Sequence, residues 1–134
     1  MRTYSQVLFL LLFQFPIYFT AFAQCTGWAK TASGEKENSA WGITLDEQKN
    51  SYVAGFYNGP TTFGNLTVND SGLFVIKNDS LGNQLWVKTF PGSFYEIFSF
   101  INYTAEGVYL ATTFDSSATF GSTILTTSGN YGIA

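Results

Sequence analysis

The sequence predicts an all-β protein built from a repeated, four-stranded antiparallel sheet. Residues 52–72 match residues 109–129 at an offset of 57, and seven of these 21 positions are identical, where roughly one or two identities would be expected by chance. Only 11% of the residues are charged and 19% are aromatic, so the chain has much to bury and little to solvate. Beta-branched and aromatic residues form short runs separated by Gly, Asn, Asp and Ser, without an amphipathic helical pattern after residue 24.

The first complete repeat spans residues 37–92. Alternation in its first strand places Trp41, Ile43 and Leu45 on one face, which indicates a half-buried strand. The next two strands are apolar on both faces, as expected for sheets that are covered on both sides. Residues 78–83 are rich in side chains that favour tight turns. The four predicted strands are residues 40–46, 51–57, 73–76 and 84–88.

The second repeat, residues 93–134, follows the same plan and is predicted to be truncated. Phe98, Phe100 and Asn102 stand where Trp41, Ile43 and Leu45 stood, and we expect Phe98 and Phe100 to be core residues because of their alternate spacing. A turn is predicted at residues 105–107 and a strand at residues 108–114. At the offset of 57, the last residues of the sequence, 131–134, align with the middle of the third strand of the first repeat.

An additional match precedes the first repeat. Trp28–Thr31 resembles Trp86–Thr89, so residues 24–36 are predicted to be the last strand of an incomplete unit. A β-propeller arranges four-stranded sheets of this kind as blades around a ring of roughly four to eight blades. The chain is therefore predicted to form an incomplete ring, with the remaining blades in missing C-terminal sequence. A β-sandwich of the same strands is the alternative, but it gives no reason for the offset of 57.

Specific segments add a resemblance to a known family. The Asp46–Gly55 segment, the Phe63–Gly64 step and the turn that leads into Leu85–Trp86 resemble the bacterial β-propeller repeat family of the seven-bladed type. The resemblance covers residues 28–134, although Asn102 and Tyr103 depart from the pattern. It implies an exported multi-repeat protein of a Gram-negative bacterium, and it implies no particular reaction.

The N-terminus predicts a signal peptide over residues 1–23, with cleavage after Ala23. Gln14 and Pro16 interrupt an apolar run that is already shorter than the ~20 residues of a membrane span, so no stable membrane span is expected after cleavage. Cys25 raises the alternative of a lipid anchor, which Gln24 disfavours because such signals generally need a small residue there. The predicted location is secreted or cell surface, in the periplasm or on the outer surface of a Gram-negative bacterium.

Composition excludes several chemistries. The chain has no histidine, which excludes Ser-His-Asp and Cys-His nucleophile systems and histidine zinc sites. Arg2 is the only arginine, and the five lysines are outnumbered by nine acids, so nucleic acid is not an expected partner. The acid pairs Glu35 with Glu37 and Asp46 with Glu47 lie in predicted turns and are not predicted to be catalytic. No cofactor and no metal ion is predicted.

Two aromatic residues are the candidate contacts for a ligand or partner. Phe94 and Tyr95 lie in the loop before the first strand of the second repeat, where flat apolar rings could contact a protein or a glycan. The turn at residues 78–83 has oxygen-bearing side chains near a glycine, as a calcium loop has, but Leu81 falls where a ligand oxygen would be needed. We therefore expect a non-catalytic scaffold or a binding and adhesion module. The alternative is part of a secreted enzyme, for example a polysaccharide-active one, whose catalytic residues lie outside this chain.

Overall fold

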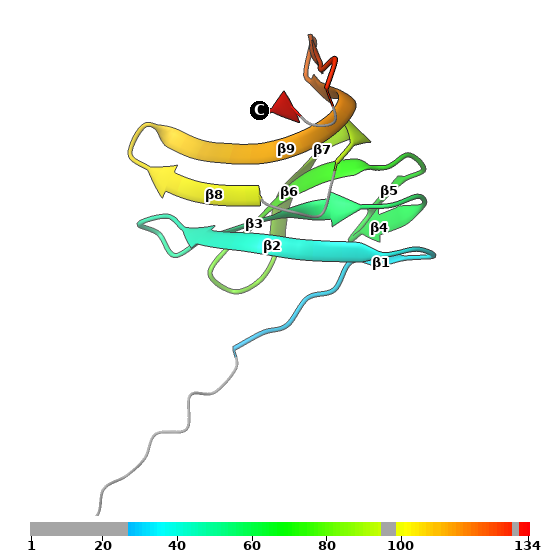
Figure 1. Ribbon diagram of the computed structural model, residues 1–134. Coiled ribbons are helices and arrows are strands. Elements are labelled where there is room, and N and C mark those ends of the chain that lie inside the picture. The colour runs from blue at the N-terminus through cyan, green and yellow to red at the C-terminus, as the bar shows by residue number, and fades with distance from the viewer. Residues whose placement is uncertain (1–26, 95–98, 130–131) are drawn as a thin grey trace, which may run out of the picture.

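The computed structural model describes residues 27–94, 99–129 and 132–134 of the chain (Figure 1). Every regular element in these ranges is a strand, which confirms the all-β prediction, and among them no helix has the length and apolar character of a membrane span. The signal peptide, its cleavage site after Ala23 and Cys25 lie outside the described residues. The strands are β1 (Ser33–Gly34), β2 (Asn38–Leu45), β3 (Ser51–Tyr57), β4 (Thr61–Phe63), β5 (Leu66–Val68), β6 (Gly72–Asn78), β7 (Gln84–Ser93), β8 (Ser99–Thr104), β9 (Gly107–Phe120), β10 (Thr123–Thr126) and β11 (Gly132–Ile133).

Strands β2, β3, β6 and β7 form four neighbouring antiparallel strands in the order of the sequence. Three of them contain a strand predicted for the first repeat in full, and β2 contains all of the predicted strand 40–46 except Asp46. The β4–β5 hairpin is inserted between β3 and β6, and β1 joins it to make a separate three-stranded sheet. The strands share one register, in which Ile43, Val53, Ile76 and Val87 stand side by side across the sheet.

Strand β9 makes the larger sheet curl over itself. Its first half pairs with β8, and its second half pairs with β7 and β10. The β8–β9 hairpin consequently lies as a second layer over β2 and β3 (Figure 1). This arrangement gives the molecule a curled, half-barrel shape.

Two apolar clusters lie on opposite faces of the four-stranded part, because successive side chains of a strand point to opposite sides. One cluster contains Ala54, Leu73 and Val75, and residues of β7, β8 and β9 pack against it. The other contains Tyr57, Phe63 and Phe74, with Phe63 contributed by the β4–β5 hairpin. The first face is therefore covered by the β8–β9 layer, and the second is covered only by the small sheet and the N-terminal segment.

Two hairpins of the structure have the same strand register at an offset of 57 residues. In the β4–β5 hairpin, Thr61 pairs with Val68. In the hairpin formed by the end of β9 with β10, Ala118 pairs with Leu125. The adjacent pairs in each hairpin have the same offset.

Similar backbone φ angles also recur 57 residues apart, at two pairs of positions. Gly64 has a φ of 60° and Gly121 a φ of 62°. Gly59 has a φ of 74°, and Ser116, its counterpart 57 residues later, has a φ of 59°. Residues other than glycine rarely adopt this left-handed conformation, so the correspondence extends to a position where the residue type itself differs.

The turn between β8 and β9 shows that the predicted core position of Phe100 is wrong. Five residues separate Leu45 from its strand partner Ser51, but only four separate Tyr103 from its partner Val108. The shorter turn shifts β8 by one residue, and a shift of one residue moves every side chain of a strand to the other face. Phe100 is consequently 70% exposed.

Ile101, and not Phe100, is therefore the structural counterpart of Ile43. Ile101 packs against the cluster of Ala54, Leu73 and Val75. Phe98, the other predicted core residue, lies outside the described residues.

Candidate functional site

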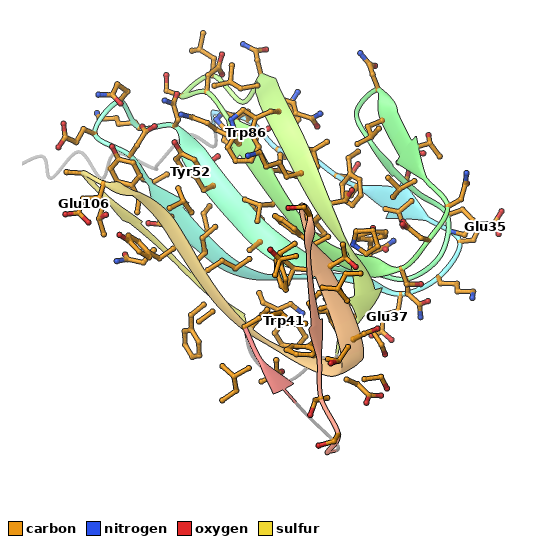
Figure 2. All side chains as sticks on the ribbon, turned by 90° about the horizontal axis from the view of Figure 1, so that it is seen from above. Glu35, Glu37, Trp41, Tyr52, Trp86 and Glu106 are labelled. Carbon is orange, nitrogen blue, oxygen red and sulfur yellow. The ribbon has the colours of Figure 1, made fainter. Side chains whose placement is uncertain are left out.

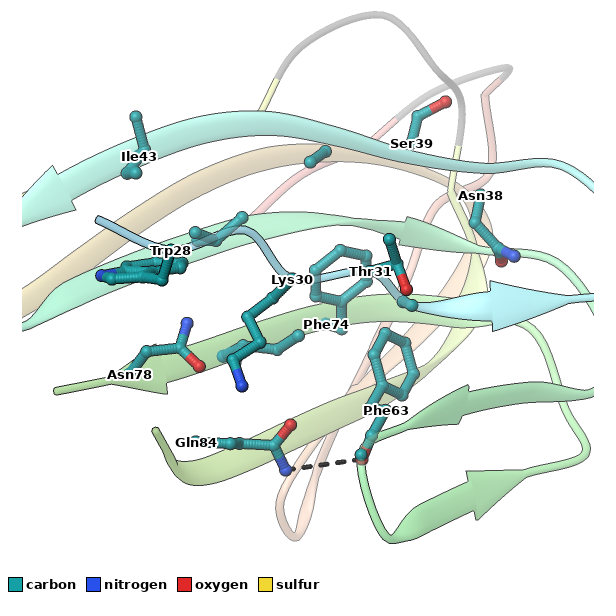
Figure 3. A pocket seen from close by; sticks show the side chains of 15 residues that line it. Trp28, Lys30, Thr31, Asn38, Ser39, Ile43, Phe63, Phe74, Asn78 and Gln84 are labelled. Atoms are coloured by element: carbon teal, nitrogen blue, oxygen red, sulfur yellow. Dashed lines mark hydrogen bonds between the residues drawn. The ribbon is translucent and has the colours of Figure 1, made fainter. Parts of the chain in front are cut away.

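A groove of about 400 Å³ lies on the face of the four-stranded sheet that β8 and β9 leave uncovered (Figure 3). Val53, Phe74 and Ile76 contribute apolar side chains from β3 and β6, and Ile43 contributes one from β2. Since β2 has no further strand beside it among the described residues, Ile43 remains 65% exposed. The groove therefore offers an apolar surface that the rest of the described chain does not cover.

Trp28 forms one wall of the groove (Figure 3). Its indole Nε1 donates a hydrogen bond to the carbonyl oxygen of Ser80 at 3.3 Å. Gly82 lies against the indole, and a Cβ atom at this glycine would stand 2.5 Å from Trp28 Cγ. The N-terminal segment is thus held on the sheet by the turn between β6 and β7.

Two polar side chains of the groove, Asn38 and Gln84, are engaged within the protein. Gln84 Nε2 donates to the carbonyl oxygen of Phe63 at 3.4 Å, and Asn38 Oδ1 accepts from Thr61 Oγ1 at 3.0 Å. Lys30 is the only charged side chain among the described lining residues. This composition suits contact with an apolar surface better than stabilisation of a charged transition state.

A second hollow, of about 510 Å³, contains one of the two predicted contact residues. Phe94 lines it together with Phe56, and the ring of Phe94 packs edge-on against Phe120 with the centroids 6.2 Å apart. The ring of Phe94 is half-buried. Tyr95, the other predicted contact, lies outside the described residues.

Polar side chains of the second hollow form two hydrogen-bonded pairs. Tyr57 Oη donates to Asp70 Oδ1 at 2.9 Å, and Ser71 Oγ donates to Asn58 Oδ1 at 3.1 Å. Burial, together with the hydrogen bond to Asp70, raises the pKa of Tyr57 well above its ordinary value, so the phenol stays protonated. Aromatic faces beside hydroxyl, amide and carboxylate groups make a surface of mixed character, which is suited to a sugar or a polar peptide.

In the acid pair Asp46 and Glu47, the carboxylate of Asp46 is engaged within the protein. Asp46 is buried at the end of β2, where its Oδ2 accepts hydrogen bonds from Asn50 at 2.8 Å and from Tyr52 at 3.2 Å. Lys77 Nζ lies 3.2 Å from the same oxygen. Burial alone would raise the pKa of Asp46, but the hydrogen bonds from Asn50, Lys77 and Tyr52 outweigh it and lower the pKa from 3.8 to about 2.

The acid pair Glu35 and Glu37 lies apart from Glu106 (Figure 2). Glu35 and Glu37 are exposed at one end of the molecule, and Glu106 is exposed at the opposite end (Figure 2). Within the described part of the chain, no group of three or more His, Cys, Asp or Glu residues could hold a metal ion.

The turn weighed as a calcium loop uses its carboxylate internally. Asp79 Oδ1 accepts from the backbone N–H groups of Leu81 at 2.9 Å and Asn83 at 2.8 Å, and Oδ2 accepts from the Asn83 amide at 2.9 Å. These hydrogen bonds, those from Asn83 foremost, lower the pKa of Asp79. Asp46 makes the same contacts with Gln48 and Asn50. The turn interpretation therefore accounts for the geometry of this loop.

Comparisons with known proteins do not place the chain in a family. The chain matches no family model, no curated protein and no solved structure. The resemblance to propeller repeats and its implications for function depend on the residues and the geometry alone.

Sequence reasoning did not predict the groove. The strands that supply Val53 and Ile76 were expected to be covered on both faces. One face is covered by β8 and β9, and the other is covered in part, by the small sheet and the N-terminal segment. The match between Trp28–Thr31 and Trp86–Thr89 was the available signal. The strand predicted over residues 24–36 is not formed at residues 27–32, and only the short β1 lies within that range, paired with β4. This segment therefore covers only part of the face.

Proposed function

We propose that the chain is part of an exported β-propeller and acts as a non-catalytic scaffold or binding module at the cell surface or outside the cell. The observation that carries this proposal is the shared register of the β4–β5 and β9–β10 hairpins at an offset of 57 residues. The equal backbone conformations at Gly64 and Gly121 support the same interpretation. Units that repeat and bury their faces only against neighbouring units are typical of propellers and related repeat proteins.

The arrangement of β2, β3, β6 and β7 also supports a propeller blade. A blade is a four-stranded antiparallel sheet packed face to face with its neighbours. Here four consecutive antiparallel strands carry the start of the second repeat, β8 and β9, on one face. The open groove lies where a preceding blade would pack.

The hollow beside Phe94 supports a binding role over a catalytic one. Asp70 is the only acid among the described residues that line this hollow, and its Oδ1 accepts the hydrogen bond from Tyr57. Hydrolysis of a glycosidic bond ordinarily needs two carboxyl groups on either side of the scissile bond. A hollow with one engaged carboxylate can bind a polar ligand, but it lacks that arrangement.

Binding of soluble polysaccharides would test this role. The purified protein is titrated with a panel of neutral and acidic polysaccharides, and heat of binding and release of reducing ends are measured on the same samples. We expect binding of at least one polysaccharide without release of reducing ends. Phe94→Ala should weaken that binding about tenfold, which corresponds to about 1.4 kcal/mol, whereas Tyr109→Ala, an exposed aromatic on another surface, should not.

Circular dichroism of each variant shows whether the fold is retained, because Phe94 also contacts Phe120. If Phe94→Ala is unfolded, Asn58→Ala probes the same hollow from an exposed position. Release of reducing ends by the wild-type protein would overturn the non-catalytic part of the proposal.

Export has its own test. The gene is expressed with its natural N-terminus in a Gram-negative host, and the periplasmic and surface fractions are analysed by mass spectrometry. We expect a product in those fractions that begins at Gln24. Retention of an uncleaved product in the cytoplasm would contradict export.

A further inference from the structure

The chain contains one complete contact between its two layers. On the four-stranded sheet, Tyr52 is 6% exposed and Ala54 is fully buried beneath β8 and β9. From the other layer, Ile101 and Leu110 pack against the cluster that contains Ala54, and the ring of Tyr103 stacks on that of Tyr52 with the centroids 5.9 Å apart. One side of this contact is the face of the first repeat that carries Tyr52 and Ala54. The other side is the face of the second repeat that carries Ile101 and Leu110.

The residues of the second repeat that correspond to Tyr52 and Ala54 are exposed. Tyr109 and Ala111 follow Tyr52 and Ala54 by 57 residues, at the same positions on the matching strand. Tyr109 is 55% exposed, and Ala111 is exposed as well. The outer face of β8 and β9 is therefore equivalent to the face that the second repeat buries within the chain.

The residues of the first repeat that correspond to Ile101 and Leu110 lie on the face that β8 and β9 leave uncovered. The strand register makes Ile43 and Val53 equivalent to Ile101 and Leu110. Ile43 is exposed on the sheet face that β8 and β9 leave uncovered, and Val53 is half-buried beside it in the groove. Each end of the chain thus exposes one of the two faces that meet in its interior.

We propose that a second copy of this chain docks through these faces, with its Tyr109 face on the Ile43 face of the first copy. The contact continues the packing already present between the two layers, so its occupant is a surface of the same chemistry. It joins two different surfaces, so it is head-to-tail and leaves one open face at each end of a pair. Further copies can add until a ring closes or a filament forms.

The polar groups of the two faces fit the same arrangement. Tyr109 Oη donates to Glu106 Oε2 at 3.1 Å, as Tyr52 Oη donates to Asp46 Oδ2 at 3.2 Å. In the interior contact, the Tyr103 N–H donates to Thr44 Oγ1 at 3.2 Å. The residue at the matching position of the open face is Asn102, which also carries an acceptor oxygen.

The matching position for Tyr103 on the first repeat is Leu45, which is exposed. In a docked pair, the ring of Tyr109 would therefore lie over Leu45 where the ring of Tyr52 lies over Tyr103. An aromatic ring on a leucine buries apolar area from both sides, which favours association.

Two single variants and their mixture test the proposal by analytical ultracentrifugation across a broad concentration range. The wild-type mass should rise with concentration. Ile43→Lys removes one face and Tyr109→Lys the other, so each variant alone should stay monomeric. An equimolar mixture of the two retains one productive contact, so it should reach twice the mass of either variant alone and no more.

Ile124→Lys, which places the same charge at an exposed position of β10, is the matched control and should associate as the wild type does. A wild-type protein that stays monomeric at every concentration would overturn the proposal. So would a mixture that forms no pair, because only a head-to-tail contact lets the two variants complement each other. Polysaccharide binding in the hollow beside Phe94 does not use these faces, so the two proposals can fail separately.

Discussion

Lys49 and Gly82 occupy the same position in two turns at one end of the four-stranded sheet. Each is the fourth residue of a five-residue turn that begins with Asp and ends with Asn, Asp46 to Asn50 and Asp79 to Asn83. Both have a positive φ, 63° for Lys49 and 83° for Gly82. The two turns share their hydrogen bonds but differ in the residue that adopts the left-handed conformation.

Replacing Lys49 by glycine should stabilise the protein. A residue with a Cβ atom in the left-handed conformation costs roughly 1–2 kcal/mol, and part of this is offset by the greater freedom of glycine in the unfolded chain. We expect Lys49→Gly to raise the free energy of unfolding by about 0.5–1 kcal/mol, measured by urea denaturation. The reciprocal change Gly82→Ala should lower it, because the new Cβ also meets the ring of Trp28.

Ser116→Gly tests the correspondence between the two repeats. Ser116 has the φ of its counterpart Gly59 but carries a Cβ atom. The substitution should raise the free energy of unfolding by about 0.5–1 kcal/mol, seen as a higher melting temperature. Ser117→Gly, at the next residue, has no positive φ to relieve and should be neutral or destabilising. Equal effects of the two substitutions would contradict the assignment.

The stability of the protein should decrease as the pH falls from about 4 to about 2. The pKa of Asp46 is about 2 in the folded state and 3.8 ordinarily, so the charged form is favoured by folding. Its contribution is fully present above the unfolded pKa and is lost as pH falls through the folded pKa. The lowered pKa of Asp79 acts in the same direction.

Asp46→Asn should weaken that pH dependence and should lower stability near neutral pH, because the ion pair with Lys77 is lost. Urea denaturation at a series of pH values measures both effects. Glu47→Gln removes a carboxylate from the same turn without changing these hydrogen bonds and is the matched control. A slope that Asp46→Asn leaves unchanged would show that other groups cause it.

Gly55→Ala should be strongly destabilising. A Cβ atom at Gly55 would collide with the carbonyl oxygen of Ser39 and would lie 2.8 Å from both Ala40 Cα and Phe74 Cζ. Two of these three atoms belong to the backbone of β2 and cannot move without disturbing the sheet. Overpacking of this kind costs about 1–3 kcal/mol. Gly129→Ala, where the nearest atom is a side-chain oxygen at 3.8 Å, should be close to neutral in the same melting experiment.

The strands of the first repeat could be predicted because their alternation and turn residues are local signals. The predicted strands lie within β2, β3, β6 and β7, except that the first was extended by one residue to Asp46. The β8–β9 turn falls at Ala105 and Glu106, inside the predicted residues 105–107. The pairing of Gly92 and Ser93, at the end of β7, with β9 joins strands that are not adjacent in the sequence. A single sequence carries little direct information about such pairing.

The face on which Phe100 lies could not be obtained from alternation alone. The offset of 57 residues assigns Phe100 to the position of Ile43. Because the turn between β8 and β9 is one residue shorter, Phe100 is displaced by one residue from that position. The location of Phe94 in a hollow was a prediction from loop position, and its packing against Phe120 was not anticipated. The groove escaped prediction because it depends on which face of a sheet is left uncovered.

Strand β9 belongs to both layers of the molecule. Its residues 107–114 carry the upper layer, and its residues 115–120 are joined to the end of β7, where Gly92 pairs with Ala118. Separation of the upper layer therefore strains the sheet below it, so the two layers should open in a single cooperative step. A partly opened state that bares only one layer is disfavoured, and the apolar surface between the layers is rarely presented to solvent or to proteases.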